Sequence, residues 1–334
     1  NDDKTVDGIY GKGQSATAND GQLTLLTGFS RMVAVQARRN DTSIYREQPV
    51  ATLDTGYAAV QLDQPLSSTH RLQIKASVNS LQRDEPWYVR IPYLVVSPEL
   101  GALFDQDKAQ ANAFVDDPMA SCTGSTAIAT NARLRAVCLR LLDPNYTNLR
   151  NYTTNQDYTE QRRELDISDL WVPLPNVRMV VGANASQSLA SSRNFLNGDA
   201  ENHTVAGFGH VEWRLAPTWL LNIGGYAERD AHAGSSASPC AALSWQFQPN
   251  QVVRLVHSRA VRTPDIFEDQ ADAHYYATTD DRSQSAYDGA YFQSAKSMGQ
   301  PLTERIRSNE VSYFGQYSGI PLSLDVRLFR DELD

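Results

Sequence analysis

The side chains best suited to chemistry are aromatic and charged residues in two long polar stretches. The first stretch, residues 82–156, begins with EPWYVRIPYLVV, in which Trp87, Tyr88, Arg90 and Tyr93 stand close together. Aromatic rings beside a guanidinium suit an anionic aromatic ligand, through cation–π contacts and charge-assisted hydrogen bonds. The alternative is that this stretch extends two strands and packs on itself.

The second stretch, residues 263–302, is rich in carboxylates and holds two adjacent tyrosines. Oxygen-rich clusters can bind calcium, but the spacing here matches no calcium loop, so a solvated run of charges is the simpler interpretation. Tyr275 and Tyr276 could stack on a bound ligand such as a sugar. The charged and imidazole side chains of the stretch include Asp265, Glu268, Asp269, Asp272, His274, Asp280 and Asp281.

No motif in the sequence predicts an enzyme, a metal site or a cofactor. The nucleophile elbow G-x-S-x-G does not occur. The 6 histidines are scattered, with no metal-binding pair at helical spacing, and no Cys/His spacing resembles a zinc site. We therefore predict no catalytic residue, although polar side chains inside a barrel can in principle be arranged as a triad.

The cysteines give a hint about the cellular compartment. Cys122 and Cys138 bracket a spacer that can close as a disulfide loop, which stabilises a fold by about 3 kcal/mol in the chain-entropy model. Such a bond indicates an oxidising compartment. Two unrelated thiols are the alternative. Cys240 stands in a strand pattern and is expected to be a small apolar residue there.

Composition excludes several classes of protein. The 334 residues are 41% hydrophobic and 21% charged, with a net charge of −9. No apolar run approaches the roughly 20 residues that a membrane-spanning helix needs. The 10 Phe, 15 Tyr and 5 Trp are too many aromatics for a disordered chain. The acidic balance argues against a nucleic-acid partner, which favours a basic surface.

The dominant hydrophobic period is two, which predicts long half-buried strands. In residues 321–330, Leu322 and Leu324 share one face, and Ser323 and Asp325 share the other. The same alternation runs through residues 71–79 and 203–215. Segments of this length suit a tilted membrane-crossing strand of about 9–11 residues better than an ordinary strand of about 5–6.

The connections between these segments alternate between short and long. Short turns are expected at residues 65–69, 172–176, 216–218, 248–250 and 317–320, and long loops at 82–156, 188–202, 230–237 and 263–302. Short turns at one side and long loops at the other are typical of an outer-membrane barrel, in which the apolar face meets lipid and the polar face lines the lumen.

The two faces can be assigned from the alternation. The side chains predicted to line a wet lumen are Arg178, Asn184, Glu212, Arg214, Asn222, Glu228, Gln246, Arg254, Glu310 and Asp325. The aromatics predicted to form interfacial girdles are Trp171, Trp213, Trp219, Tyr226, Trp245, Phe247 and Tyr313. The alternative is a large soluble all-β protein with ordinary core aromatics.

At this point the sequence resembles a known family. The run SPCAALSWQFQPNQVVRLVHSRAVRTPDIFE at 238–268 is similar to a signature of TonB-dependent outer-membrane receptors. Segments 176–188, 208–230 and 302–334 are similar to further strands of that family, in the family's order. The residues that carry the match include Arg254, Arg262, Thr263, Pro264, Glu268 and Glu310. Cys240 replaces a usual Arg, and His257 replaces a usual Tyr.

The resemblance implies an antiparallel up-and-down transmembrane β-barrel of about 22 strands, with a plug in its lumen. About ten to twelve strands are expected here, so we expect an arc of that barrel. We find no plug-like segment, no TonB box and no aromatic terminal strand, and we expect residues 1–334 to be the barrel portion of a longer protein. Residues 82–156 and 263–302 would be extracellular loops, and the RTP motif at 262–264 a structural strand end.

The resemblance also implies a function. The expected partners are a ferric siderophore or a similar scarce nutrient, TonB acting through a plug outside this chain, and the lipid of a Gram-negative outer membrane. Trp87, Tyr88, Arg90, Tyr93, Tyr275 and Tyr276 are the loop residues expected to meet the ligand. A passive barrel, such as a porin or an autotransporter translocator, and a soluble all-β binding protein remain alternatives. A split gene whose product does not fold is another, because open sheet edges cannot persist in lipid.

Overall fold

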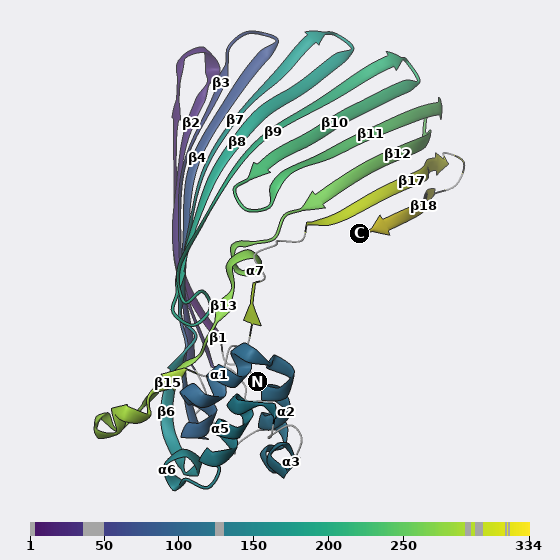
Figure 1. Ribbon diagram of the computed structural model, residues 1–334. Helices are drawn as coiled ribbons and strands as arrows, with labels where there is room; N and C mark the ends of the chain where they lie inside the picture. Colours follow the sequence, from purple (N-terminus) through teal and green to yellow (C-terminus); the bar gives the residue numbers. More distant parts are fainter. Residues whose placement is uncertain are drawn as a thin grey trace.

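One large antiparallel sheet dominates the computed structural model, which describes residues 4–35, 50–123, 130–290, 295–297, 303–317, 319 and 321–334. Its twelve strands follow the order β1-β2-β3-β4-β7-β8-β9-β10-β11-β12-β17-β18, so every strand pairs with the next strand of the sheet along the chain. Figure 1 shows the strands fanning out in a curved sheet whose edges are β1 and β18. The predicted up-and-down strand arrangement is confirmed.

The strands of this main sheet are long. They are β1 (Lys4–Ala16), β2 (Gln22–Val35), β3 (Val50–Pro65), β4 (His70–Asp84), β7 (Tyr158–Leu174), β8 (Val177–Ser192), β9 (Gly198–Ala216), β10 (Trp219–Asp230), β11 (Gly234–Gln248), β12 (Gln251–Arg262), β17 (Glu304–Tyr317) and β18 (Leu322–Leu333). They range from 12 residues in β10 to 19 in β9. A bilayer crossing needs about 9–11 residues, so each of the twelve strands is long enough to cross.

The connections are sorted by end, as the sequence predicts. The short turns join β1 to β2 (with the short helix η1, Ala18–Asp20), β3 to β4, β7 to β8, β9 to β10, β11 to β12 and β17 to β18. The two longest described connections join β4 to β7 and β12 to β17 at the opposite end, which we call the long-loop end.

Two predicted long loops are wrong. Strand β8 continues to Ser192 and β9 begins at Gly198, so the predicted loop 188–202 is mostly strand. Strand β10 continues to Asp230 and β11 begins at Gly234. The Asp230 carboxylate accepts hydrogen bonds from the backbone N–H groups of His232 and Ala233, each at 2.9 Å, which allows a tight reversal before β11 begins.

The insert between β4 and β7 is largely helical, which the sequence analysis does not predict. It holds β5 (Pro86–Pro92), η2 (Tyr93–Val96), α1 (Pro98–Gln106), α2 (Lys108–Asp116), α3 (Pro118–Thr123), α5 (Ala132–Arg140), α6 (Pro144–Thr147) and β6 (Leu149–Asn155). Ser97, Asp107 and Asn131 cap helices with their side-chain oxygens, which satisfies the free N–H groups of each first turn.

The helices enclose a dry core of their own. Leu103 and Val137 are fully buried, and Leu100, Phe114 and Leu134 are nearly so. Leu100, Leu103 and Phe104 recur at helical spacing and so put one apolar face of α1 into this core. No helix in the described part of the chain is long and apolar enough to cross a membrane.

The insert between β12 and β17 joins the helical insert. Its elements are α7 (Ile266–Gln270), β13 (Asp272–Ala273), β14 (Tyr276–Thr279), η3 (Arg282–Tyr287), β15 (Gly289–Ala290) and β16 (Ala295–Lys296). A four-stranded sheet in the order β15-β14-β6-β5 contains strands from both inserts. We call the two inserts together the cap, and Figure 1 shows it at one end of the main sheet.

Candidate functional site

One face of the main sheet carries polar residues in continuous rows. Lys75, Asp166, Asn184 and Glu228 belong to one row, with Ala206 opposite both Asn184 and Glu228. The Asn184 amide nitrogen donates to Asp166 Oδ1 at 2.5 Å. We call this the polar face. The registers place nine of the ten residues predicted to line the lumen on it, and the tenth, Gln246, stands at an irregularity in the pairing of β11 with β12.

The opposite face, which we call the apolar face, carries the aliphatic side chains. A row across five strands shows its character: Leu25, Val60, Ala76, Leu165 and Ala185. Exposed aliphatic side chains over so large an area would be unfavourable in water. The alternation therefore fits a sheet with lipid on one side and an aqueous space on the other.

Aromatic residues gather on the apolar face near the short turns. Trp219 stacks on Trp245 with ring centroids 5.5 Å apart, and Trp245 contacts Phe247 at 5.4 Å. Phe247 lies 6.4 Å from Tyr313. One predicted girdle residue is misplaced, because Tyr226 pairs with Phe208 and belongs to the polar face.

A cavity of about 680 Å³ lies over the first strands, and most of the residues lining it belong to the polar face. Tyr10, Gly28, Tyr57, Asn79 and Arg162 form one row across five strands and all line the cavity. Gly28 leaves no side chain between the two tyrosines. Two phenols with a guanidinium and an amide suit an anionic aromatic ligand. Sequence reasoning missed this row, because only the strand registers bring its members together.

The cap joins its two inserts through buried aromatics. Tyr152 of β6 is fully buried, and its hydroxyl donates to the Tyr287 carbonyl at 3.2 Å. Burial raises the pKa of Tyr152 to about 12. Strand β14 pairs with β6, with Ala277 opposite Thr154. The two long inserts therefore share one small core and one sheet.

The six predicted ligand residues all lie in the cap but not on one surface. Four of them are on strands of its four-stranded sheet, whereas Tyr93 is in η2 and Tyr275 precedes β14. Tyr88, Arg90 and Tyr276 share one face of the sheet. Tyr88 lies opposite Thr153, and Thr153 lies opposite Thr278. Tyr276 is on the same face as Thr278 because the two are two positions apart on one strand. The guanidinium of Arg193, from the connection between β8 and β9, stacks 3.8 Å from the Tyr276 ring centroid. This face, which we call the cap's inner face, therefore adjoins the long-loop end of the main sheet.

Trp87 and Tyr93 have structural surroundings instead. Trp87 Nε1 donates to Glu85 Oε1 at 2.9 Å, and Arg83 pairs with the same fully buried carboxylate. Tyr93 is only 8% exposed, and burial raises its pKa. Its ring packs against Tyr146 at 5.0 Å and Tyr287 at 5.2 Å. The structure thus places Tyr93 inside the core of the cap.

Tyr275 belongs to a second aromatic cluster at the junction of cap and sheet. It meets Phe195 edge-on at 6.2 Å, and Phe195 in turn contacts Phe267 and Tyr158. These contacts seat the second insert on the ends of β7 and β8, which is a packing role.

Two residues of the family motif, Arg262 and Glu268, form hydrogen bonds at the position where β12 ends and the second insert of the cap begins. Arg262 donates through Nε and Nη2 to Glu304 at 2.9 and 3.1 Å, and through Nη1 and Nη2 to Glu268 at 2.9 and 3.0 Å. This pairing lowers the pKa of the Glu268 carboxyl. After Thr263, Pro264 cannot donate to a ladder, and β12 ends at Arg262.

The other two motif residues lie within the sheet. Arg254 opposes Ser244 and Ser312, and Glu310 opposes Val256, all on the polar face. Neither touches the cap cluster around Arg262.

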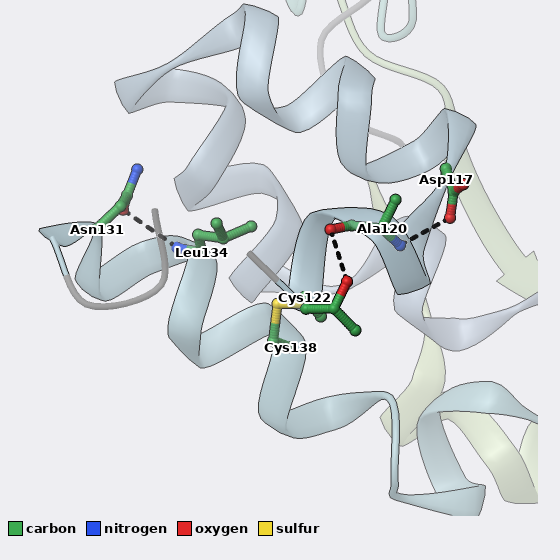
Figure 2. Close-up of a disulfide and its surroundings, with 7 residues drawn as sticks. Asp117, Ala120, Cys122, Asn131, Leu134 and Cys138 are labelled. Atoms are coloured by element: carbon green, nitrogen blue, oxygen red, sulfur yellow. Dashed lines mark hydrogen bonds between the residues drawn. A yellow bond between two sulfur atoms is a disulfide. The ribbon is translucent and has the colours of Figure 1, made fainter. Parts of the chain in front are cut away.

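A disulfide fastens the helical part of the cap. Cys122 of α3 and Cys138 of α5 are joined, with Cα atoms 5.6 Å apart. Figure 2 shows the bond between the two helices, with Asn131 capping α5 and Asp117 accepting from the Ala120 N–H. The bond closes a segment whose core is small, so it adds restraint where apolar burial is limited. Cys240 is free and exposed.

Within the described ranges, no group of three or more His, Cys, Asp or Glu side chains is arranged to hold a metal ion.

The comparisons with known proteins were made for sequence and for structure. No family model and no curated protein matches the sequence. Among solved structures, the siderophore receptor PirA from Acinetobacter baumannii matches with a TM-score of 0.59 at 9% identity, over 99% of this chain and 43% of that chain. The ferric-catecholate import receptor Fiu from E. coli K12 matches with a TM-score of 0.59 at 9% identity, over 99% of this chain and 52% of that chain.

The chain has the fold of a siderophore-receptor barrel. A mutant of the ferric enterobactin receptor PfeA from Pseudomonas aeruginosa agrees, with a TM-score of 0.56 at 12% identity over 99% of this chain and 42% of that chain. The chain thus spans roughly half the length of these receptors. The resemblance to TonB-dependent receptors, inferred from sequence motifs, is confirmed at the level of this barrel fold.

Proposed function

We propose that this chain is the barrel portion of a TonB-dependent receptor that binds and imports a ferric siderophore across a Gram-negative outer membrane. The observation that carries the proposal is the siderophore-receptor barrel fold over 99% of the chain, with lipid-suited and water-suited faces. The remaining strands, which would pair with the open edges, and a plug that contacts TonB would come from the rest of the receptor.

The cap would capture the ligand and the polar face would receive it. Tyr88, Arg90 and Tyr276 offer two rings and a cation on the cap's inner face. Tyr10, Tyr57 and Arg162 offer the same combination on the polar face. Catecholate and similar chelates are anionic and aromatic, so both places suit them. TonB would favour the conformation that releases the ligand from the cap.

The test is uptake of radioactive iron by iron-starved cells that express the native gene. Ferric catecholate should enter wild-type cells and should not enter when TonB is deleted. Uptake that persists without TonB would contradict the proposal and favour a passive barrel. A protein that fractionates with soluble proteins, and not with the outer membrane, would favour a soluble binding protein.

The site itself is tested with Tyr88→Ala/Arg90→Ala. Loss of one ring and one cation should weaken ferric-catecholate binding to outer membranes by about tenfold or more, since each such contact contributes about 1 kcal/mol or more. Leu142→Ala is the matched control, because Leu142 is in the cap and 87% exposed but lies outside its four-stranded sheet. If Tyr88→Ala/Arg90→Ala binds ferric catecholate as tightly as Leu142→Ala does, the cap's inner face does not contact the ligand.

A further inference from the structure

Helix α7 of the second insert contacts the ends of several main-sheet strands through three consecutive side chains. Glu268 accepts two hydrogen bonds from the arginine at the end of β12, at 2.9 and 3.0 Å. Asp269 faces His232, which lies in the turn between β10 and β11. Gln270 donates to the Glu201 carbonyl of β9 at 3.0 Å. Figure 1 shows α7 beside these strand ends, so this helix is a contact through which the cap docks on the main sheet.

The first two of these contacts use different cations. A guanidinium keeps its charge throughout the pH range in which proteins work, so the contact at Glu268 always has its positive partner. An imidazole gains and loses its proton between about pH 5 and 8. The contact between His232 and Asp269 is therefore an ion pair only while His232 is protonated.

The Asp269 carboxylate depends on that charge. Its side chain is only 7% exposed, and its Oδ2 atom is buried without a hydrogen bond in the described part of the chain. Nδ1 of His232 lies 3.1 Å from Oδ2, at an angle outside hydrogen-bond geometry, so this contact provides attraction between opposite charges. A buried carboxylate without a counter-charge is unfavourable. Among the residues that the structure describes, no lysine or arginine forms an ion pair with Asp269.

The other ring nitrogen of His232 also faces an oxygen. Nε2 lies 3.0 Å from the Glu201 carbonyl oxygen. A ring protonated only at Nδ1 can accept from Gln270 Nε2, 3.3 Å away, but it turns a lone pair towards that carbonyl. A ring protonated only at Nε2 donates to the carbonyl and leaves Asp269 without a counter-charge. Only the imidazolium, with a proton on both nitrogens, suits both oxygens.

The remaining charged groups around His232 do not supply a fixed positive charge. Asp230, in the same turn, accepts from the His232 backbone N–H at 2.9 Å and from two neutral side chains of β9. The Glu201 carboxylate pairs with the imidazole of His203, 2.9 Å away. Glu268 is occupied by the arginine of β12. The described groups that face His232 from its own turn, from β9 and from α7 are thus acidic, apart from a second imidazole.

The chain after α7 leads to the ligand surface of the cap. The N–H of Asp272 donates to the Phe195 carbonyl at 3.0 Å. The N–H of Tyr276 donates to Asn194 Oδ1 at 3.2 Å, and the Arg193 guanidinium stacks on the Tyr276 ring. The segment from α7 to Tyr276 therefore follows the connection between β8 and β9, and release of α7 should loosen the position of Tyr276.

We propose that protonation of His232 docks the second insert on the main sheet and that loss of this proton releases it. The proposal rests on the proposed function, because the docked segment carries Tyr276 of the ligand surface. The stabilisation is present at lower pH, where the imidazolium pairs with Asp269, and it is lost as pH rises and the imidazole gives up its proton. The receptor would thus hold its ligand more tightly in mildly acidic than in alkaline surroundings.

The test is hydrogen exchange of the full receptor in detergent, expressed as protection factors of the α7 amides. In wild type these should fall about fivefold or more between about pH 5.5 and about pH 8, since a charge-assisted contact is lost. His232→Gln should give a flat profile at the lower value, and Asp269→Asn should also remove the dependence on pH. His232→Arg keeps a positive charge and should stay protected throughout. His203→Gln is the matched control, because its ring pairs along its own strand, and it should behave as wild type does.

The effect on the ligand is measured as ferric-catecholate binding to outer membranes at about pH 6 and about pH 8. The chelate itself titrates, so the affinity of His232→Gln is divided by that of wild type at each pH. The variant should bind about fivefold more weakly than wild type at the lower pH and equally at the higher. A ratio that does not change with pH would overturn the link to the ligand.

Three results of the exchange experiment would overturn the proposal. They are a flat profile in wild type, the same fall in wild type and His232→Gln, and a fall that disappears in His203→Gln. The exchange measurement needs no ligand. Uptake that persists without TonB would therefore overturn the proposed function and leave the exchange result standing, whereas a flat profile with TonB-dependent uptake would overturn this proposal alone.

Discussion

The main sheet and the cap are stabilised in different ways. The sheet buries little against itself, and residues such as Ile223 and Val205 are more than half exposed on its apolar face. The cap has a dry interior in which Leu103, Val137 and Tyr152 are fully buried. The sheet therefore depends on its surroundings to cover its apolar side chains, while the cap covers its own.

This difference indicates that the cap, and not the main sheet, is the region that can change its position. A sheet that spans a membrane is held by ladder hydrogen bonds and by lipid, so its registers are fixed. The cap attaches to it through a few groups at the long-loop end, among them Glu85, Arg262 and the cluster around Phe195. Because its two inserts share one core, we expect them to move together when a ligand binds.

The largest effect is expected from the centre of the cap. Tyr152→Ala removes a fully buried ring between the two inserts and should destabilise the cap by about 3–5 kcal/mol. Hydrogen exchange should then show loss of protection in β5, β6 and β14, with β9 and β10 unchanged. Tyr152→Phe, which loses the hydroxyl and its hydrogen bond to the Tyr287 carbonyl, should cost about 1 kcal/mol. Joint loss of protection in the main sheet would show that the two regions do not unfold separately.

The free energy of unfolding of the main sheet should instead depend on whether a charge is placed on its apolar face. Ile223→Arg places a guanidinium between Val211 and Ala241 and should lower the free energy of unfolding in lipid vesicles by about 2–4 kcal/mol. Asn222→Arg, one residue away on the polar face and opposite Glu212, should change it little. If the two substitutions cost the same, the assignment of faces is wrong.

The disulfide should matter to the cap alone. Replacing both Cys122 and Cys138 by Ser opens a loop with a sequence separation of 16 and should cost about 3 kcal/mol of local stability. Limited proteolysis should then cut between α2 and α6 faster, while the main sheet stays intact. Cys240→Ser is the control and should leave the proteolytic pattern as it is. A slower or unchanged rate of cleavage in the double variant would contradict this role.

The smallest effect is a pH dependence at the junction of the two regions. The Arg262 guanidinium holds the pKa of Glu268 below its usual 4.5, so the charged carboxylate stabilises α7 above that pH. This stabilisation is lost as pH falls through the lowered pKa. The protection factors of the α7 amides, which are exchange rates corrected for the intrinsic rate at each pH, should therefore fall below pH 4.5 in wild type. In Glu268→Gln they should stay nearly constant. Parallel pH profiles for the two proteins would show that Glu268 does not fasten α7.

The sequence predicts the sheet well because its pattern is local. Period-two alternation alone places Arg178 and Glu212 on one face, and their pairing in the structure agrees. The tight turns after Ser192 and Asp230 were missed because polar strand ends and loops have similar composition. Tyr226 was assigned to the wrong face because a tyrosine near a strand end is common to both faces.

The cap is harder to predict because its contacts are distant in sequence. Nothing in residues 152–154 indicates that they pair with residues 277–279, and this pairing decides that Tyr88 and Tyr276 share a face while Tyr93 is buried. The helix α1 did have a local signal, since Leu100, Leu103 and Phe104 recur at helical spacing. Its small size and the polar residues around it obscured that signal.

The central claim is that the main sheet spans an outer membrane with its cap outside the cell. Single cysteines on a Cys240→Ser background test it most directly, with a membrane-impermeant maleimide added to intact cells. Leu142→Cys in the cap and Leu66→Cys in a short turn are suitable positions, because these side chains are 87% and 59% exposed. We predict that Leu142→Cys is labelled at once and Leu66→Cys only after the outer membrane is permeabilised. Labelling of both in intact cells, or of Leu66→Cys alone, would contradict the account.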